Sequence, residues 1–276
     1  MTLWSVFDVT ALPRTIWQKR DLLVQMSMRE VLQRYRGSFL GLVWSVAHPL
    51  LMLSVYTFVF TVIFPARWGT NAAANAGHGA FAVIMFCGMT IFNLFSEAVN
   101  GSCGCIVANP NLVKKVIFPL EILPLAKSLA TLILGLAWFV LLFLGAFIFM
   151  GGVPLTALLL PVLLVPFALF TLGVSYFVAS LGVYIRDTQY LIGVILQILF
   201  FATPIFYSLE VVPERFRGLL QLNPLVVFID QSRTLLFTGT LPSLRVFAFA
   251  SLISFVVFQL GYVFFMKTKK GFADVL

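Results

Sequence analysis

Three arginines, Arg29, Arg34 and Arg36, stand immediately before the first long apolar run of the chain. A guanidinium group is planar and can donate two parallel hydrogen bonds to the oxygens of one phosphate group. This spacing therefore favours binding of a phosphate-bearing headgroup next to a membrane. The alternative interpretation is that these arginines only set the membrane topology and contact lipid phosphates without specificity.

Motifs of nucleotide-binding and hydrolytic enzymes are absent from the sequence. There is no G-x-x-x-x-G-K-[ST] loop for ATP, no H-E-x-x-H and no G-x-S-x-G. Glu97 is the only carboxylate within an apolar run, too little for a proton relay, and we interpret it as a helix-end or subunit-contact residue. Cys87, Cys103 and Cys105 lack metal-ligand spacing, and His48 is interpreted as a polar residue at a kink. We therefore expect neither catalytic residues nor a metal site.

The composition excludes a soluble protein. Of the 276 residues, 61% are hydrophobic and only 10% are charged, whereas soluble domains carry roughly 25% charged residues. The mean hydropathy is +1.04. The net charge of +8 is therefore interpreted as a topology signal and not as a nucleic-acid-binding surface.

The apolar runs predict the number of transmembrane helices. A helix needs ~20 apolar residues to cross the hydrocarbon core. Residues 128–185 contain no charge, which is too long for one helix and fits two, with a break at Gly151-Gly152-Val153-Pro154. The chain is thus predicted to be an all-α polytopic membrane protein, one domain over residues 1–276, with six spans at residues 40–64, 79–106, 123–150, 155–183, 188–207 and 246–266.

Lysine and arginine positions predict the orientation. Six spans place both termini on one side, and that side carries 13 Lys and Arg residues against 5 on the other. The positive-inside bias then places both termini in the cytoplasm. Residues 1–15 show no signal peptide.

Two cytoplasmic segments are predicted not to cross the membrane. Residues 15–36 carry an imperfect apolar stripe from Trp17 to Tyr35, which predicts an amphipathic helix in the headgroup plane. This helix is either a topology anchor or an element that moves during transport. Residues 109–119 read as a short helix, because Asn109 suits the N-cap and Pro110 the first turn. It is either a connecting turn or a rigid helix that receives force from a partner.

The connection at residues 208–243 is predicted to form a re-entrant outer hairpin. Its charges forbid a full span, its apolar residues are too many for a free loop, and Asn223-Pro224 breaks any helix in the middle. Two short helices that dip into the outer leaflet satisfy both facts. Two surface helices are the alternative.

The run from Arg34 to Trp44 reads R-Y-R-G-S-F-L-G-L-V-W and continues to His48-Pro49. An arginine-rich helix that leads through R-Y-x-x-S-x-L-G-x-x-W into a proline-bearing first span resembles the ABC-2 type permeases that export polysaccharides such as O-antigen, capsule and teichoic acid. Residues 109–124 and Asn223-Pro224-Leu225 agree with this pattern. The resemblance covers essentially the whole chain and is strongest to O-antigen exporters.

The resemblance implies a homodimer in the bacterial inner membrane, paired with two copies of a separate ATPase that would bind ATP and Mg²⁺. No cofactor is expected on this chain and nucleic acid is not an expected partner. The substrate would be a lipid-linked polysaccharide whose headgroup enters beside the three arginines, among membrane lipids. The outer hairpin would close the exit. The coupling helix would present Asn109, Pro110, Asn111, Lys114 and Lys115 to the ATPase.

Aromatic residues are the expected lining of the path, because sugar C–H faces stack on aromatic rings. The alternative is that these rings face lipid or the protein core. The residues concerned are Tyr56, Phe60, Phe64, Phe200, Phe201, Phe206 and Tyr207. Two other functions stay open, an ABC-2 exporter of a drug or lipid and, less favoured, a membrane-embedded glycan-processing enzyme.

Overall fold

The computed structural model describes residues 16–63, 78–114, 118–221 and 223–276. These residues form helices and connections and contain no strand, which confirms the all-α class. The main helices are α3 (Arg20–Arg34), α4 (Trp44–Phe58), α5 (His78–Cys103), α6 (Pro110–Val113), α7 (Ile122–Met150), α8 (Leu160–Tyr184), α9 (Thr188–Ala202), α10 (Glu214–Gln221), α11 (Pro224–Arg233), α12 (Leu244–Thr268) and α13 (Phe272–Val275). Short 3-10 or π turns lie at Gly41–Val43, Val59–Ile63, Leu155–Leu159, Leu209–Val211, Thr234–Thr238 and Lys269–Gly271.

Five helical segments are long and apolar enough to cross a membrane, so the chain is a multi-pass membrane protein. They are Gly41–Phe58, Gly79–Cys103, Ile122–Met150, Leu155–Tyr184 and Leu244–Val275. Helix α9 is apolar but has 15 residues, about 22 Å of helix against a hydrocarbon core of about 30 Å. A sixth span at this position therefore stays a prediction.

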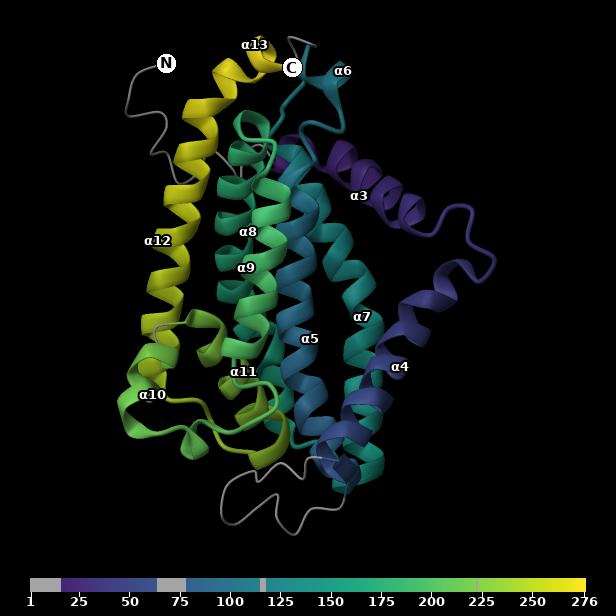
Figure 1. Cartoon of the computed structure of the whole chain (residues 1–276), viewed down its shortest axis with the longest axis vertical. Helices are drawn as coiled ribbons and strands as arrows, with labels where there is room; N and C mark the ends of the chain where they lie inside the picture. The colour runs from purple at the N-terminus through teal and green to yellow at the C-terminus, as the bar shows by residue number, and fades with distance from the viewer. Residues whose placement is uncertain (1–15, 64–77, 115–117, 222) are drawn as a thin grey trace.

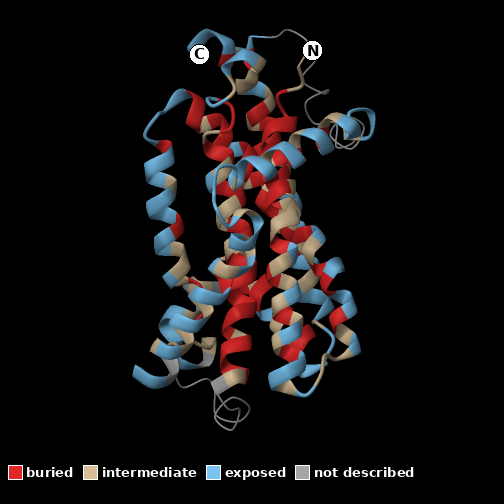
Figure 2. Ribbon diagram, turned by 90° about the vertical axis from the view of Figure 1, so that its right-hand side faces the viewer, coloured by how far each residue is buried: buried red, intermediate tan, exposed pale blue. Residues whose placement is uncertain are grey.

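Helix α5 is the centre of the bundle (Figure 1). It packs between α7 and α8, and α12 packs along α8 at the edge of the molecule. In the most apolar 18-residue stretch of α5, 78% of the residues are buried. In the corresponding stretch that contains α4, only 6% are buried. Buried residues accordingly run along the middle of the bundle, and the outer helices expose most of their surface (Figure 2). Helix α4 leans away from the rest of the bundle and still contacts α5 and α7.

Two glycines let α8 and α12 approach at backbone distance. A Cβ on Gly173 would lie 2.5 Å from the Cα of Phe258, and a Cβ on Gly261 would lie 2.0 Å from the carbonyl oxygen of Gly173. Small residues that permit such close helix contact are characteristic of helix bundles in membranes. There, van der Waals packing between helices drives their association, because the hydrophobic effect does not act between apolar surfaces in lipid. This contact fixes α12 against the bundle.

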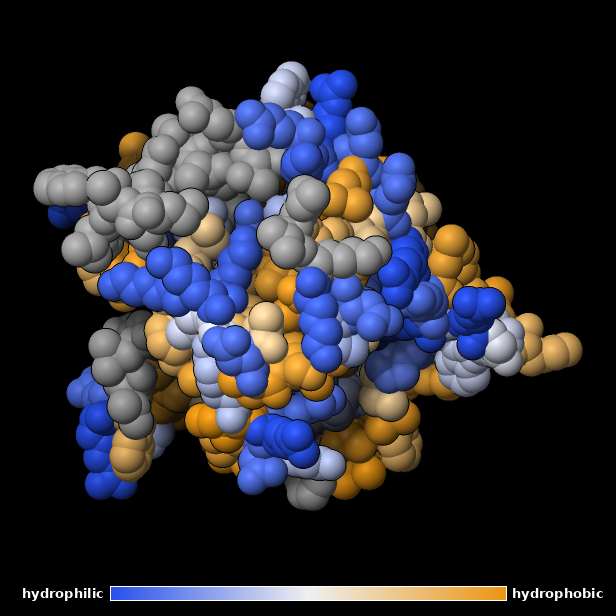
Figure 3. All heavy atoms as spheres, turned by 90° about the horizontal axis from the view of Figure 1, so that it is seen from above, coloured by the Kyte–Doolittle hydropathy of each residue, from blue (hydrophilic) through white to orange (hydrophobic). Residues whose placement is uncertain are grey.

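The two ends of the bundle differ in character. We name them the α6 end, which also carries α3 and the C-terminus, and the α10 end, which carries α10 and α11 (Figure 1). Hydrophilic side chains spread across the α6 end, while apolar side chains form its flanks (Figure 3).

At the α10 end, Arg233 of α11 donates hydrogen bonds to the carbonyl oxygens of Ile84 (3.3 Å), Pro204 (2.8 Å) and Ile205 (2.9 Å). Arg233 thereby ties α11 to α5 and to the segment after α9.

Helix α3 lies across the α6 end and packs on α7. Its buried residues are Leu23, Ser27 and Val31, spaced one turn apart. The Ser27 hydroxyl donates to the carbonyl oxygen of Leu23 at 2.8 Å, so this polar residue is buried at little cost. Trp17 and Val24 are exposed, and the apolar stripe seen in the sequence is therefore only partly the face that packs.

Candidate functional site

Arg34 and Glu97 form a bidentate ion pair between α3 and α5. The guanidinium Nη1 donates to Oε2 at 2.8 Å and Nη2 donates to Oε1 at 2.7 Å. The two side chains are 40% and 35% exposed, so the pair lies at the border between protein and solvent. The hydrogen bonds to Glu97 raise the pKa of Arg34 above its usual value, and Arg34 therefore stays charged.

A second ion pair lies one helical turn earlier on α3. Glu30 accepts a hydrogen bond from the ammonium group of Lys127 on α7. Glu30 and Arg34 are four residues apart and so lie on one side of α3. Helix α3 is thus attached to α5 by the ion pair of Arg34 and to α7 by the ion pair of Glu30.

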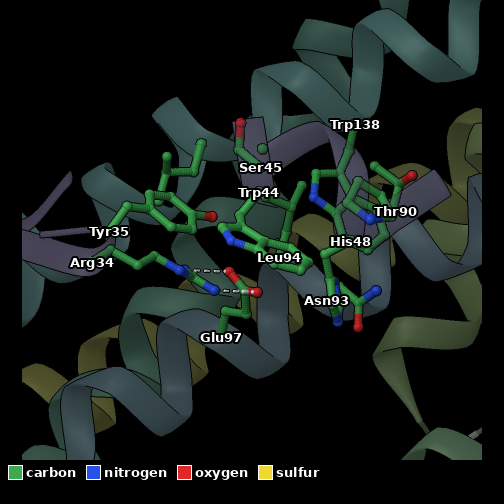
Figure 4. Close-up of a pocket in the computed structure, with 13 residues that line it drawn as sticks. Arg34, Tyr35, Trp44, Ser45, His48, Thr90, Asn93, Leu94, Glu97 and Trp138 are labelled. Carbon is green, nitrogen blue, oxygen red and sulfur yellow. Dashed lines mark hydrogen bonds and ion pairs between the residues drawn. The ribbon is translucent and has the colours of Figure 1, made fainter. Parts of the chain in front are cut away.

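A cavity of about 260 Å³ opens beside the Arg34–Glu97 pair, between α4, α5 and α7. We name it the tryptophan cavity, because Trp44 and Trp138 line it. Arg34 and Glu97 lie at one end, and His48, Thr90 and Trp138 lie at the other (Figure 4). Its remaining lining residues are Tyr35, Ser45, Pro49, Asn93, Leu94, Leu134 and Gly135.

A second cavity, of about 380 Å³, lies on the other side of the ion pair. We name it the charged vestibule, because Glu30 and Lys127 line it together with Arg34 and Glu97. The two cavities share Arg34, Glu97 and Leu134. The ion pair therefore stands at their junction, with charged groups on one side and aromatic and uncharged polar groups on the other.

The three arginines predicted to meet a headgroup are not brought together. Arg34 is at the junction, but Arg29 and Arg36 are exposed and line neither of these two cavities. The fork of Arg34 already holds a carboxylate, so a phosphate would have to replace Glu97 or share the guanidinium with it. Tyr35 also lines the tryptophan cavity, and its burial raises the pKa of the phenol.

The predicted aromatic lining is in part a packed cluster. The rings of Tyr56, Phe200 and Phe206 lie 5.2–6.2 Å from one another. Phe206 is buried, whereas Phe201 is 61% exposed. The hydroxyl of Tyr207 donates to the carbonyl oxygen of Phe201 at 3.1 Å. The side chain of Phe60 and the whole of Phe64 lie outside the described residues.

The segment predicted to couple to an ATPase contains a single helical turn, α6, at the α6 end of the bundle. Asn109 stands at the N-cap position, but its side chain accepts no capping bond; its Nδ2 donates to the carbonyl oxygen of Cys105 at 2.9 Å. Pro110, Asn111 and Lys114 are exposed. Lys115 lies outside the described residues.

Sequence reasoning missed the role of the polar residues of α5 in this site. Thr90, Asn93 and Glu97 all line the tryptophan cavity. Their spacing of three and four residues puts them on one face of a helix, and such a polar stripe in an otherwise apolar span is a signal that could have found the site. Among the described residues, no group of three or more His, Cys, Asp or Glu could hold a metal ion.

The sequence matches the ABC-2 type transporter family over residues 21–237. A Myxococcus xanthus protein named O-antigen export system permease protein RfbA is 31% identical over 95% of this chain and 98% of its own. A Klebsiella pneumoniae protein of the same name is 28% identical over 93% of this chain and 95% of its own. An Escherichia coli protein named polysialic acid transport protein KpsM is 24% identical over 77% and 80% of the two chains.

The family match covers well over half of the chain and includes all but the first residue of α3, the Arg34–Glu97 pair and both cavities. It confirms the resemblance that the run from Arg34 to Trp44 indicates. The chain belongs to the ABC-2 type transporter family.

Proposed function

We propose that this chain is the membrane-spanning permease subunit of an ATP-driven exporter, and that it moves a lipid-linked polysaccharide across the bacterial inner membrane. The observation that carries the proposal is the similarity over nearly the full length of both chains to proteins named O-antigen export permeases. The similarity to a polysialic acid transport protein supports the same substrate class.

The proposed topology has six spans, with α9 and the residues that follow it as the fifth, and both termini in the cytoplasm. The lysine and arginine distribution supports this orientation. The α6 end would then face the cytoplasm, and α10 and α11 would form a re-entrant hairpin at the outer side. The fastening of α11 by Arg233 to carbonyl oxygens of α5 and of the segment after α9 supports a hairpin that is built into the bundle.

The proposed assembly contains two copies of this chain and two copies of an ATPase subunit that binds ATP and Mg²⁺. This sequence has no ATP-binding loop, so ATP hydrolysis would take place on a separate subunit. Helix α6 would be the coupling element, since Pro110, Asn111 and Lys114 are exposed beside the C-terminus. Lys114 and Lys115 would meet acidic groups of the ATPase.

The proposed entrance for the lipid headgroup is the junction at Arg34, with Arg29 and Arg36 as further positive charges near the membrane surface. Arg34 is the last residue of α3, the proposed interfacial helix, and lines both the tryptophan cavity and the charged vestibule. The exposed ring of Phe201 contacts Phe200, which in turn contacts Tyr56, and this row of rings supports an aromatic surface for the glycan chain where α4 and α9 would meet a partner copy.

The test is complementation in a strain that lacks its own export permease. Expression of this chain together with its genomic ATPase partner should restore glycan on the cell surface, and a tagged chain should co-purify with that ATPase. Restored surface glycan with co-purification supports the proposal. Accumulation of lipid-linked glycan at the cytoplasmic face of the inner membrane despite normal expression of both subunits would contradict it, and drug or lipid export by the same strain would identify another cargo.

A further inference from the structure

We infer that the tryptophan cavity is a sugar-binding subsite, which holds the saccharide unit joined to the phosphate of a lipid-linked glycan while Arg34 holds the phosphate. This inference rests on the proposed function and names the part of the substrate that the site recognises. It assigns a role to Trp44, His48, Asn93 and Trp138, none of which the proposed entrance uses.

The polar groups of the cavity match a ligand rich in hydroxyl groups. Among the described residues, neither the amide of Asn93 nor the imidazole of His48 has a hydrogen-bond partner, although both line the cavity. Each can donate and accept. The hydroxyls of Ser45 and Thr90 donate to carbonyl oxygens of their own helical turns at 2.7 and 2.8 Å, which leaves their oxygen lone pairs as acceptors. Sugar hydroxyls also donate and accept, so the several hydroxyls of one sugar unit can form hydrogen bonds with all four of these side chains.

The aromatic groups supply the apolar half of a sugar site. Trp138 is 9% exposed and is held in place by Phe86, whose ring stacks on it at 5.5 Å with an interplanar angle of 4°. The ring of His48 is tilted by 52° against Trp138 at 6.5 Å. Trp44 lies near the Arg34–Glu97 pair (Figure 4). The C–H face of a pyranose ring packs on such pre-organised ring surfaces, which carry partial negative charge.

The size of the cavity limits the ligand to one sugar unit. Its volume of about 260 Å³ is just below the range of roughly 300–1,000 Å³ of typical small-molecule sites. It is lined by residues of α3, α4, α5 and α7 of one chain, and at this volume a polysaccharide could not pass through it. The cavity would therefore recognise the end of the glycan that is joined to the lipid, and not its repeating units.

The position of Arg34 beside the tryptophan cavity matches the position of the phosphate beside the first sugar of the substrate. Arg34 lies at one end of the cavity, and His48, Thr90 and Trp138 lie at the other. A lipid-linked glycan has a phosphate between the lipid and the first sugar. With that phosphate at the fork of Arg34, the first sugar reaches the tryptophan cavity, because the two are adjacent (Figure 4).

The experiment measures binding to the full chain in nanodiscs, in complex with its ATPase. The probes are polyprenyl diphosphate without sugar and polyprenyl diphosphates that carry one hexose, one 6-deoxyhexose or one N-acetylhexosamine. At least one sugar should increase the affinity by about tenfold, the value of one or two net hydrogen bonds. Asn93→Leu and Trp44→Leu should abolish this gain and leave the affinity for the sugar-free lipid unchanged.

The matched control is Asn100→Leu, because Asn100 lies two turns from Asn93 on α5 and lines only the charged vestibule. It should retain the full gain. The subsite is overturned if no sugar improves binding, if both Asn93→Leu and Trp44→Leu keep the gain, or if Asn100→Leu loses it equally. If soluble sugar diphosphates compete with the polyprenyl diphosphate probes as well as the lipid-linked compounds do, the conclusion that the ligand is lipid-linked is overturned.

A parallel export assay separates this inference from the proposed function. If the wild-type complex restores surface glycan and both Asn93→Leu and Trp44→Leu leave the sugar-dependent gain intact, only the subsite is wrong. If the wild-type complex restores no surface glycan, the proposed function itself is wrong. Membrane insertion of each variant, measured by quantitative blotting of the membrane fraction, shows that lost binding does not come from lost protein.

Discussion

The guanidinium of Arg233 occupies the space that a side chain on Gly88 would need. A Cβ on Gly88 would lie 2.8 Å from the Nη2 atom of Arg233 and 3.4 Å from the Cγ2 atom of Ile205. The end of an arginine side chain can usually move aside, but this one donates hydrogen bonds to three backbone carbonyl oxygens. The glycine on α5 therefore permits the attachment of α11.

We expect Gly88→Ala to lower the thermal stability of the purified protein and to impair export. The added methyl group displaces the guanidinium from at least one carbonyl oxygen, and a hydrogen bond to a charged group contributes about 1.5–3 kcal/mol. Differential scanning fluorimetry in detergent measures the change. Gly193→Ala is the matched control, because a Cβ there meets no atom within 4 Å. Equal melting temperatures of the two variants would contradict the attachment role.

The role of the two parallel hydrogen bonds of the Arg34 guanidinium group can be tested by a substitution that keeps the positive charge. Arg34→Lys retains the positive charge, and with it the topology, but loses the two parallel hydrogen bonds. If Arg34 binds a substrate phosphate, the rate of glycan export should fall by about tenfold, which corresponds to 1.4 kcal/mol. Membrane insertion and ATPase association should not change.

Arg29→Lys is the control for this prediction, because Arg29 lies on the same helix and is exposed. Glu97→Gln adds a second test. It removes the carboxylate that occupies the fork, so the affinity for polyprenyl diphosphate should rise. An unchanged export rate in a variant that carries both Arg34→Lys and Arg36→Lys would show that these residues act only as topology signals.

The coupling role of α6 predicts the effect of charge reversal. Lys114→Glu combined with Lys115→Glu should leave expression and insertion intact and should abolish co-purification of the ATPase, because like charges then meet at the contact. A pull-down of the tagged chain measures this. Arg215→Glu, at the other end of the bundle, is the control and should retain the ATPase. Normal export by the double variant would refute the coupling assignment.

Cysteine labelling tests the proposed orientation. Cys87, Cys103 and Cys105 are buried, so the native chain should give a low background with a membrane-impermeant maleimide. Thr240→Cys should react in intact cells, and Lys270→Cys should react only after permeabilisation. Both positions are exposed. Reaction of Lys270→Cys in sealed cells would place the C-terminus outside.

The amino-acid sequence by itself determined the class of the protein. Long apolar runs can avoid water only in a membrane or a large core, and a chain with 10% charged residues cannot cover a soluble surface. The run from Arg34 to Trp44 was specific enough to indicate the family. Both conclusions depend on composition and on local order along the chain, which the sequence states directly.

The tertiary structure alone decided which polar residues meet. Arg34 and Glu97 are 63 residues apart, and their contact depends on how α3 crosses the bundle and on the rotation of α5 about its axis. The buried face of α3 includes Ser27, which satisfies its hydroxyl within the helix, so a pattern of apolar residues could not identify that face. Likewise, Trp44, Asn93 and Trp138 come from three helices, and only the packing of those helices brings them around one cavity.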